Sequence, residues 1–280
     1  MSDSQEIQEL EALLREETRG EYTIERALGS GWGAVYRATE IPSRRQVAIK
    51  AFSPDQALGT GTARRFLQGV QLAAAFDHPN IIPIFRLGTN GMLLWYAMPY
   101  VDGESLAAML ERKGRLSLGE TIEILRPVGD ALDYAHRHGV IHRNVKPANV
   151  MIAADGRVLL TDFELAQECQ PWSLSASDSI VGTPYYMSGE QARGAGITPA
   201  ADQYSVGVMA YAMLAGHVPF DAECVVDILR KHCSEQPAPL EILRPGLQQA
   251  VYAAVDRALA KQPWERFPSV AAFVAAMAGA

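Results

Sequence analysis

The chain has 280 residues, of which 48% are hydrophobic, 20% charged and 8% aromatic. This composition is typical of a soluble globular protein and excludes the disordered and fibrous classes. The net charge of −7 gives no electrostatic support for binding to nucleic acid or to an anionic membrane surface, so we expect neither as a partner.

The three cysteines, Cys169, Cys224 and Cys233, form no CxxC pair and have no metal-ligand spacing. This pattern indicates a reducing compartment and free, partly buried thiols. No apolar run reaches the roughly 18 residues that a membrane span needs. The acidic amino terminus does not resemble a signal peptide. We therefore expect a cytoplasmic location and no membrane span within this chain.

Residues 1–20 are expected to form an acidic N-terminal extension to a domain that covers residues 21–280. Ile7, Leu10 and Leu14 have helical spacing, which favours a short amphipathic helix outside the main domain. The alternative is a solvated, frayed tail, because an isolated helix of this length is marginally stable in water.

Strand signals dominate from residue 22 to about residue 101. Five strands are predicted, in YTIERAL, AVYRATEI, RQVAIKAF, IIPIFRLG and MLLWYAMPY. Asn90-Gly91 is a strong hairpin signal between the last two. One helical stretch, roughly residues 62–76, interrupts the strands. Residues 21–101 are therefore expected to form a small antiparallel sheet with one helix.

The periodicity is mainly helical over residues 102–280, with a hairpin at Asp155-Gly156. Helices are predicted over 104–112, 117–138, 199–214, 225–232, 247–261 and 269–277. The helix at 199–214 is apolar nearly all round, so it should cross the centre of a core. Segment 167–197 is long and rich in serine, glycine and proline, as functional loops often are. We expect two lobes with a ligand-binding cleft between them.

Three motifs contain groups that can bind phosphate or the metal ion that accompanies it. The glycine hairpin LGSGWGAVY, residues 28–36, can bring backbone amides close to phosphates, although alone it could be only a flexible turn. VAIK places Lys50 in an apolar strand, where it needs an anionic partner unless it snorkels from a sheet edge. HRNVKPAN and the later TDFE can direct Asn149 and Asp162 onto one hard cation.

In this order the motifs resemble those of the eukaryotic-type protein kinase family, and particularly of bacterial serine/threonine kinases. The resemblance continues through GTPYYMSGE, DQYSVG and RALAKQPWERF and begins at Tyr22. It implies an α+β, two-lobed protein kinase-like fold. A small antiparallel β lobe with one helix would span residues 21–101, and a larger, mainly helical lobe would span residues 102–280.

The resemblance also implies a site for ATP and Mg²⁺. Lys50 matches the lysine that steadies the α- and β-phosphates, and Lys146 matches the lysine that touches the γ-phosphate. Asn149 and Asp162 match the two magnesium ligands. Asn144 occupies the position of the catalytic base.

Adenine recognition is implied for the residues at the end of the last predicted strand. Met98 matches the gatekeeper, and the carbonyl group of Pro99 and the amide of Val101 would read the base, so the N–H that Pro99 lacks is not needed. The other residues implied around the base and phosphates are Leu28, Gly29, Gly31, Val35, Ala48 and Met151.

Two departures from the family pattern remove charged groups. Asn144 replaces the aspartate that accepts the substrate's proton, and loss of a general base typically costs about 10²- to 10⁴-fold in rate. Gly69 stands where the glutamate that pairs with the strand lysine belongs. Gln68, Gln71 or Asp162 could replace that glutamate in part, and Asp162 is preferred because it would also lie near the phosphates.

Two further departures affect the phosphate side of the site. The glycine loop is one residue shorter than in the family, which moves its amides, and Trp32 would fill part of the space. Glu164 replaces the glycine of D-F-G. Its carboxylate could either help to hold magnesium or repel ATP.

The residues that hold the larger lobe together match the family. Asp202 would anchor the catalytic loop, Glu190 would pair with Arg266, and His142 would pack on Phe163. His136, His138, His217 and His232 show no ligand spacing and are expected to be surface or packing residues. The serines at 173, 175, 177 and 179 would be either targets of another kinase or loop filler.

An intact scaffold with a degraded reaction centre predicts a pseudokinase. Such a domain would be a regulatory or scaffolding module that still binds ATP and contacts a protein partner, such as an active kinase or a signalling complex. The alternative is a slow or atypical but active serine/threonine kinase, because phosphoryl transfer depends mainly on positioning and charge. A small-molecule phosphotransferase is disfavoured by the peptide-substrate signature GTPYYMSGEQ.

Overall fold

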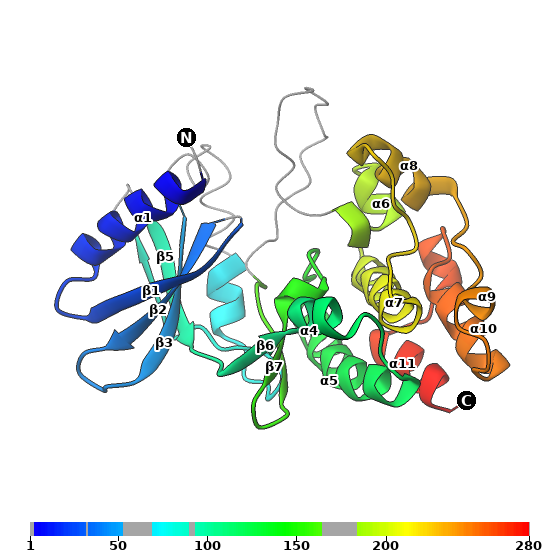
Figure 1. Cartoon of the computed structure of the whole chain (residues 1–280), viewed down its shortest axis with the longest axis horizontal. Coiled ribbons are helices and arrows are strands. Elements are labelled where there is room, and N and C mark those ends of the chain that lie inside the picture. The colour runs from blue at the N-terminus through cyan, green and yellow to red at the C-terminus, as the bar shows by residue number, and fades with distance from the viewer. Residues whose placement is uncertain (1–2, 32, 53–68, 90–92, 164–183, 280) are drawn as a thin grey trace. The chain divides into compact units, whose positions relative to one another are not determined.

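The computed structural model describes residues 3–31, 33–52, 69–89, 93–163 and 184–279. These residues divide into two compact units, as the prediction of two lobes requires (Figure 1). The β unit contains the described residues up to Asp77 and residues 82–102. The helical unit contains residues 78–81 and the described residues from Gly103 onward.

The β unit is built on a five-stranded antiparallel sheet in the order β1-β2-β3-β5-β4. Its strands are β1 (Tyr22–Gly31), β2 (Gly33–Glu40), β3 (Gln46–Phe52), β4 (Arg86–Thr89) and β5 (Leu94–Pro99). Residues 69–74, within the stretch predicted as helical, form a helix. The strand predicted in IIPIFRLG is reduced to β4, because Ile81 instead forms an isolated bridge with Leu160. The turn predicted at Asn90-Gly91 lies outside the described residues.

Helix α1 (Asp3–Glu17) covers one face of this sheet (Figure 1). Leu10 and Leu14 are buried against that face, which also carries Tyr36 and Ile49. The hydroxyl group of Tyr36 donates a hydrogen bond to the carbonyl oxygen of Ile7 at 2.7 Å. The segment forms the predicted helix, and this helix packs within the β unit rather than standing apart from it. Its status as an extension to the main domain stays a prediction. The apolar side of α1 is buried because the sheet offers it a matching apolar face.

The helical unit packs its helices around α7. The elements are β6 (Gly103–Ser105), α4 (Leu106–Lys113), α5 (Leu118–Arg137), η1 (Pro147–Asn149), β7 (Val150–Ala153), β8 (Val158–Leu160), η2 (Pro184–Tyr186), α6 (Gly189–Ala192), α7 (Pro199–Ala215), α8 (Val225–Ser234), α9 (Leu240–Leu243), α10 (Gln249–Ala258), η3 (Pro263–Glu265) and α11 (Val270–Ala278). Every residue of α7 from Ala201 to Leu214 is buried, so the prediction of a central helix is confirmed. No helix among the described residues is long and apolar enough to cross a membrane.

The long helices of this unit were predicted closely, whereas the short elements were missed. Ser117 caps α5 in a reciprocal capping box with Glu120, which explains the predicted start of that helix. The hairpin at Asp155-Gly156 joins β7 to β8. The short strand β6 adds a third strand beside β7. Neither β6 nor the single-turn helices α6 and α9 are long enough to produce a detectable hydrophobic period.

Candidate active site

Residues predicted to surround the nucleotide share one face of the five-stranded sheet. Val35 lies opposite Lys50 in the ladder, and Ala48 lies opposite Met98. Directly paired residues of antiparallel strands point to the same face, so these four side chains lie on the face that α1 does not cover. Ala48, Lys50 and Met98 are buried, and Val35 is half-buried.

Lys50 is the buried cation of this face, only 7% exposed, and its amino group lies 5.6 Å from the ring centroid of Phe52. Gly69, at the position of the family's glutamate, is a buried residue of the helix 69–74. A glycine inside a helix costs about 1 kcal/mol relative to alanine. Gln71 is exposed, which does not suit a partner for a buried ammonium group, and Gln68 lies outside the described residues.

Pro99 occupies a strand position where its missing N–H is not needed. The N–H of Tyr100 donates to the carbonyl oxygen of Gln46 at 3.4 Å. In the alternating antiparallel pattern, the main-chain groups of the preceding residue therefore face away from β3. The pairing with β3 therefore does not need the N–H that Pro99 lacks, and the contact of Pro99 with adenine stays a prediction. Val101 follows the strand and is half-buried.

The glycine hairpin is tight at its tip. Strands β1 and β2 stay paired as far as Gly31 and Gly33. Gly33 has a φ of +81°, and a Cβ there would lie 2.6 Å from the carbonyl oxygen of Ala51. Only glycine fits this position. Because pairing continues to the tip, fewer main-chain amides remain for a phosphate than in a longer loop.

The first strand also carries two other predicted residues of the nucleotide site. The register of β1 and β2 shifts between Ala27 and Gly29, which places Leu28 in a β-bulge. Leu28 is 38% exposed. Trp32 and Glu164, whose effects on phosphate binding were predicted, lie outside the described residues, as do Cys169 and the four serines.

The helical unit holds the backbone around Asn144 through the carboxylate of Asp202, which is fully buried. Its oxygens accept hydrogen bonds from the N–H groups of His142 and Arg143, at 2.9 and 2.8 Å. Nε2 of His136 donates to the same carboxylate at 2.7 Å. Asp202 thus anchors the catalytic loop, as predicted from the sequence.

Asn144 is held by its own neighbours as well. Its N–H donates to Nδ1 of His142 at 3.3 Å, and its carbonyl oxygen accepts from Nδ2 of Asn149 at 2.8 Å. Because Nδ1 of His142 is an acceptor, Nε2 carries the proton and donates to the carbonyl oxygen of Thr161 at 2.9 Å. Burial lowers the pKa of His142, consistent with a neutral ring.

Arg143 and Asp162 both have left-handed backbones, with φ values of +63° and +64°. Such a conformation costs about 1–3 kcal/mol in a non-glycine residue and is concentrated at functional sites. Arg143 is supported by two side chains: Asp202 accepts from its N–H, and Nε2 of Gln191 donates to its carbonyl oxygen at 2.8 Å.

Asn149 and Asp162 fit the predicted role of magnesium ligands. Asn149 is 3% exposed, and its amide nitrogen is committed to a carbonyl oxygen, so its side-chain oxygen is the atom suited to a cation. Its carbonyl oxygen accepts from the N–H of Thr161, which links it to the residue before Asp162. One carboxylate and one amide suit Mg²⁺ that arrives with phosphate and water ligands.

The described residues contain no group of three or more histidines, cysteines or acids that could hold a metal ion alone. Lys146, directly before η1, is half-buried, and so is Met151 in β7. The roles predicted for these two residues remain predictions.

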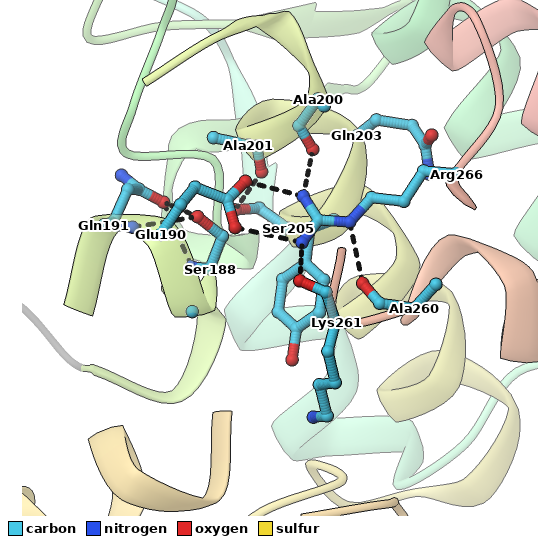
Figure 2. A network of polar contacts seen from close by, with 12 residues as sticks. Ser188, Glu190, Gln191, Ala200, Ala201, Gln203, Ser205, Ala260, Lys261 and Arg266 are labelled. Atoms are coloured by element: carbon cyan, nitrogen blue, oxygen red, sulfur yellow. Dashed lines mark hydrogen bonds and ion pairs between the residues drawn. The ribbon is translucent and has the colours of Figure 1, made fainter. Parts of the chain in front are cut away.

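The predicted ion pair between Glu190 and Arg266 is present and buried (Figure 2). Two nitrogens of Arg266 contact the two carboxylate oxygens at 2.6 and 2.9 Å. Gly189, which replaces a proline of the family, packs so closely on α8 that a Cβ would lie 3.0 Å from the carbonyl oxygen of His232. The predicted contact between His142 and Phe163 is also present, with ring centroids 4.7 Å apart.

His136 is more than the surface or packing residue that the sequence predicted. It lies between Asp202 and Asp133, with Nδ1 3.8 Å from Oδ1 of Asp133. Burial disfavours its charged form, but the carboxylates of Asp133 and Asp202, which accept from the ring, outweigh burial and raise the pKa of His136 to about 9. Its position three residues after an aspartate on a helix was the available signal.

Gln191 makes a long-range contact that was not predicted. It follows Ser188 by three residues, the spacing of a capping box, and its side chain accepts hydrogen bonds from Ser188. No helix was predicted at this point, because residues 167–197 were expected to form a long loop. The spacing also does not indicate the contact with Arg143, 48 residues earlier in the chain.

The comparisons with known proteins agree with this architecture. The family model described as "Protein kinase domain" matches residues 22–271. The crystal structure of the Mycobacterium tuberculosis PknI kinase domain is similar with a TM-score of 0.76 and 33% identity, over 93% of this chain and 96% of that one. Helix α1 precedes the region matched by the family model.

Curated relatives are also similar over most of this chain. Serine/threonine-protein kinase PrkC of Bacillus subtilis is 34% identical over 256 residues, which are 91% of this chain and 40% of PrkC. Serine/threonine-protein kinase PknJ of Mycobacterium tuberculosis is 35% identical over 266 residues, 92% of this chain and 45% of PknJ. This chain therefore spans less than half the length of these relatives.

Proposed function

This chain belongs to the protein kinase domain family, and from that premise we propose that it is a serine/threonine kinase-like signalling module that binds ATP with Mg²⁺. Phosphoryl transfer by the unmodified chain is strongly slowed by Asn144. The module acts mainly through regulation or scaffolding of a protein partner, such as an active kinase or a signalling complex.

The anchoring of Asn144 by two hydrogen bonds to its main chain is the observation that carries this proposal. Both main-chain groups of the residue are held by side chains, His142 on one side and Asn149 on the other. These contacts fix the main chain at residue 144, and the side chain at this position is the amide of Asn144. An amide cannot accept the proton of a substrate hydroxyl group, which is expected to slow transfer about 10²- to 10⁴-fold.

Each unit, taken by itself, carries residues that support ATP binding. Lys50 supplies a buried positive charge for phosphates, and the sheet face around Ala48 and Met98 is apolar, as an adenine ring requires. Asn149 and Asp162 would hold Mg²⁺. When bound, this ion would neutralise phosphate charge.

A second candidate is a slow but functioning serine/threonine kinase. It is favoured by the printed names of PrkC and PknJ, both of which are called serine/threonine-protein kinases. The intact anchoring of the loop by Asp202 favours it too, because phosphoryl transfer depends mainly on positioning and charge. The two candidates differ in how much transfer the unmodified chain supports.

The partner is proposed to be a protein rather than nucleic acid or a membrane surface. The net charge of −7 disfavours phosphate backbones and anionic lipids. The exposed side of α1 is a candidate contact surface, because Glu9 and Glu16 are exposed while its apolar side is buried.

The test compares the unmodified chain with an Asn144→Asp variant. Calorimetric titration with ATP, with and without Mg²⁺, measures binding, and transfer of labelled γ-phosphate to a generic protein substrate measures activity. We expect both chains to bind ATP and the variant to transfer phosphate about 10²-fold faster or more. Robust transfer by the unmodified chain would establish the second candidate, and no nucleotide binding by either chain would reject both candidates.

A further inference from the structure

We propose that Gln191 is a positioning residue for position 144. It acts by holding the peptide group between Arg143 and Asn144. The kinetic part of this inference rests on the proposed function, whereas the structural part stands on the hydrogen bonds alone.

A single peptide plane joins Arg143 to Asn144. The carbonyl group of Arg143 and the N–H of Asn144 belong to the same planar peptide unit. Gln191 donates from Nε2 to the oxygen of this unit at 2.8 Å, and Nδ1 of His142 accepts from its N–H at 3.3 Å. The plane that leads into residue 144 is therefore held at both of its polar ends.

The backbone of Arg143 is strained. Arg143 has a φ of +63°, which is unfavourable for a side chain other than glycine. Such a conformation persists only where the surroundings fix it. Asp202 holds the N–H before this bend and Gln191 holds the carbonyl group after it. Gln191 therefore supports the second side of the bend from another helix, as Asp202 supports the first.

The side chain of Gln191 is itself held in place. It is 3% exposed, and Oε1 accepts hydrogen bonds from the N–H and the hydroxyl group of Ser188, both at 3.0 Å. Its neighbour Glu190 is clamped by Arg266 (Figure 2). Because the oxygen is committed to Ser188, the amide nitrogen must point to Arg143. The side chain can therefore transmit the position of α6 to the loop.

Gln191 has two separable roles, capping α6 through its oxygen and holding the loop through its nitrogen. Gln191→Glu keeps an acceptor for the cap but removes the donor to Arg143. Ser188→Ala weakens the cap but keeps that donor. A merely structural role predicts the greater effect for Ser188→Ala, whereas positioning predicts the greater effect for Gln191→Glu.

The first test is hydrogen exchange in the otherwise unmodified chain. We expect Gln191→Glu to increase amide exchange over residues 142–146 about tenfold, as the loss of one fixed hydrogen bond predicts. Ser188→Ala should change amide exchange in that segment by less than about twofold. Exchange in α7 serves as the control for global folding. If Gln191→Glu does not fold, Gln191→Met removes the donor without placing a charge there.

The second test measures steady-state kinetics in the Asn144→Asp background. Adding Gln191→Glu should lower kcat about tenfold and leave KM for ATP within about twofold, because the residue positions the base and does not touch nucleotide. Equal effects of the two substitutions on exchange at 142–146 would overturn the inference. If Asn144→Asp shows no transfer, the amide at residue 144 is not the sole cause of slow transfer in the proposed function, and the exchange result still decides the role of Gln191.

Discussion

At the scale of single residues, the motifs predicted the site residues that lie within them but not the residues that reach the site through long-range contacts. Lys50, Asn149 and Asp162 were predicted as site residues because a charged or amide group at a fixed place in an ordered set of motifs has few other roles. Gln191 and His136 were missed because their contacts join segments 48 and 66 residues apart. No local pattern reports which distant carbonyl group or carboxylate such a side chain will meet.

The charge on His136 gives the anchoring network a pH dependence. The pKa of His136 is raised from 6.5 to about 9 by its two aspartates, so folding favours the protonated ring. The stabilisation is complete below about pH 6.5 and is lost as the pH rises through about 9. Thermal unfolding between pH 6 and 10 should therefore show a steeper alkaline loss in the native chain than in His136→Gln.

The difference between the stability profiles of the native chain and His136→Gln separates the contribution of His136 from those of other groups that titrate in this pH range. Lys261 is one of these, since burial lowers its pKa to about 8. Parallel profiles of the two chains would show that His136 is not charged in the folded protein.

The magnesium ligands can be tested through nucleotide affinity. Asp162→Asn removes the one carboxylate of the pair and should reduce the gain in ATP affinity on adding Mg²⁺ by at least about tenfold. Affinity without Mg²⁺ should change far less. Asp155→Asn is the matched control, because Asp155 is exposed and pairs with Arg157. Unchanged magnesium dependence in Asp162→Asn would remove this residue from the metal site.

At the scale of elements, long segments with a clear period were predicted and short or docked ones were not. The helix at residues 199–214 was recognised because its apolar residues cover every side. The helix at the amino terminus was also recognised, but its docking was not. Its spacing shows that Leu10 and Leu14 share a face. Only the assembled sheet shows that an apolar surface is there to receive them.

The docking of α1 predicts a measurable contribution to stability. Leu14 is fully buried, so Leu14→Ala should lower the free energy of unfolding by about 2–5 kcal/mol. Gln8→Ala, on the exposed side of the same helix, should change it by less than about 0.5 kcal/mol. Chemical denaturation measures both. Similar small effects for the two substitutions would mean that α1 is not docked in solution.

The ion pair that fixes α6 predicts a larger loss when it is broken from one side. Glu190→Gln leaves the guanidinium group of Arg266 buried without a counter-charge, which should cost about 3–5 kcal/mol in unfolding free energy. The exposed pair of Arg230 and Asp227 is the control, and Arg230→Ala should cost less than about 1 kcal/mol. Denaturant titration distinguishes these outcomes, and equal costs would contradict the burial of the pair.

At the scale of the whole molecule, the order of motifs predicted the fold better than any single motif. Each motif alone has an ordinary explanation, but together they span the β unit and the helical unit in family order. The comparisons confirm the family over residues 22–271. The effect of a departure such as Asn144 on activity cannot be deduced from the fold, because one fold can host different functions that depend on the residues of its site.

The central claim is that an amide at residue 144 limits phosphoryl transfer in an otherwise assembled loop. A single-turnover measurement with saturating ATP, Mg²⁺ and protein substrate, made on the native chain and on Asn144→Asp, tests it most directly. The account predicts a rate at least about 10²-fold higher for Asn144→Asp. Equal rates in two chains that both transfer phosphate readily would contradict it.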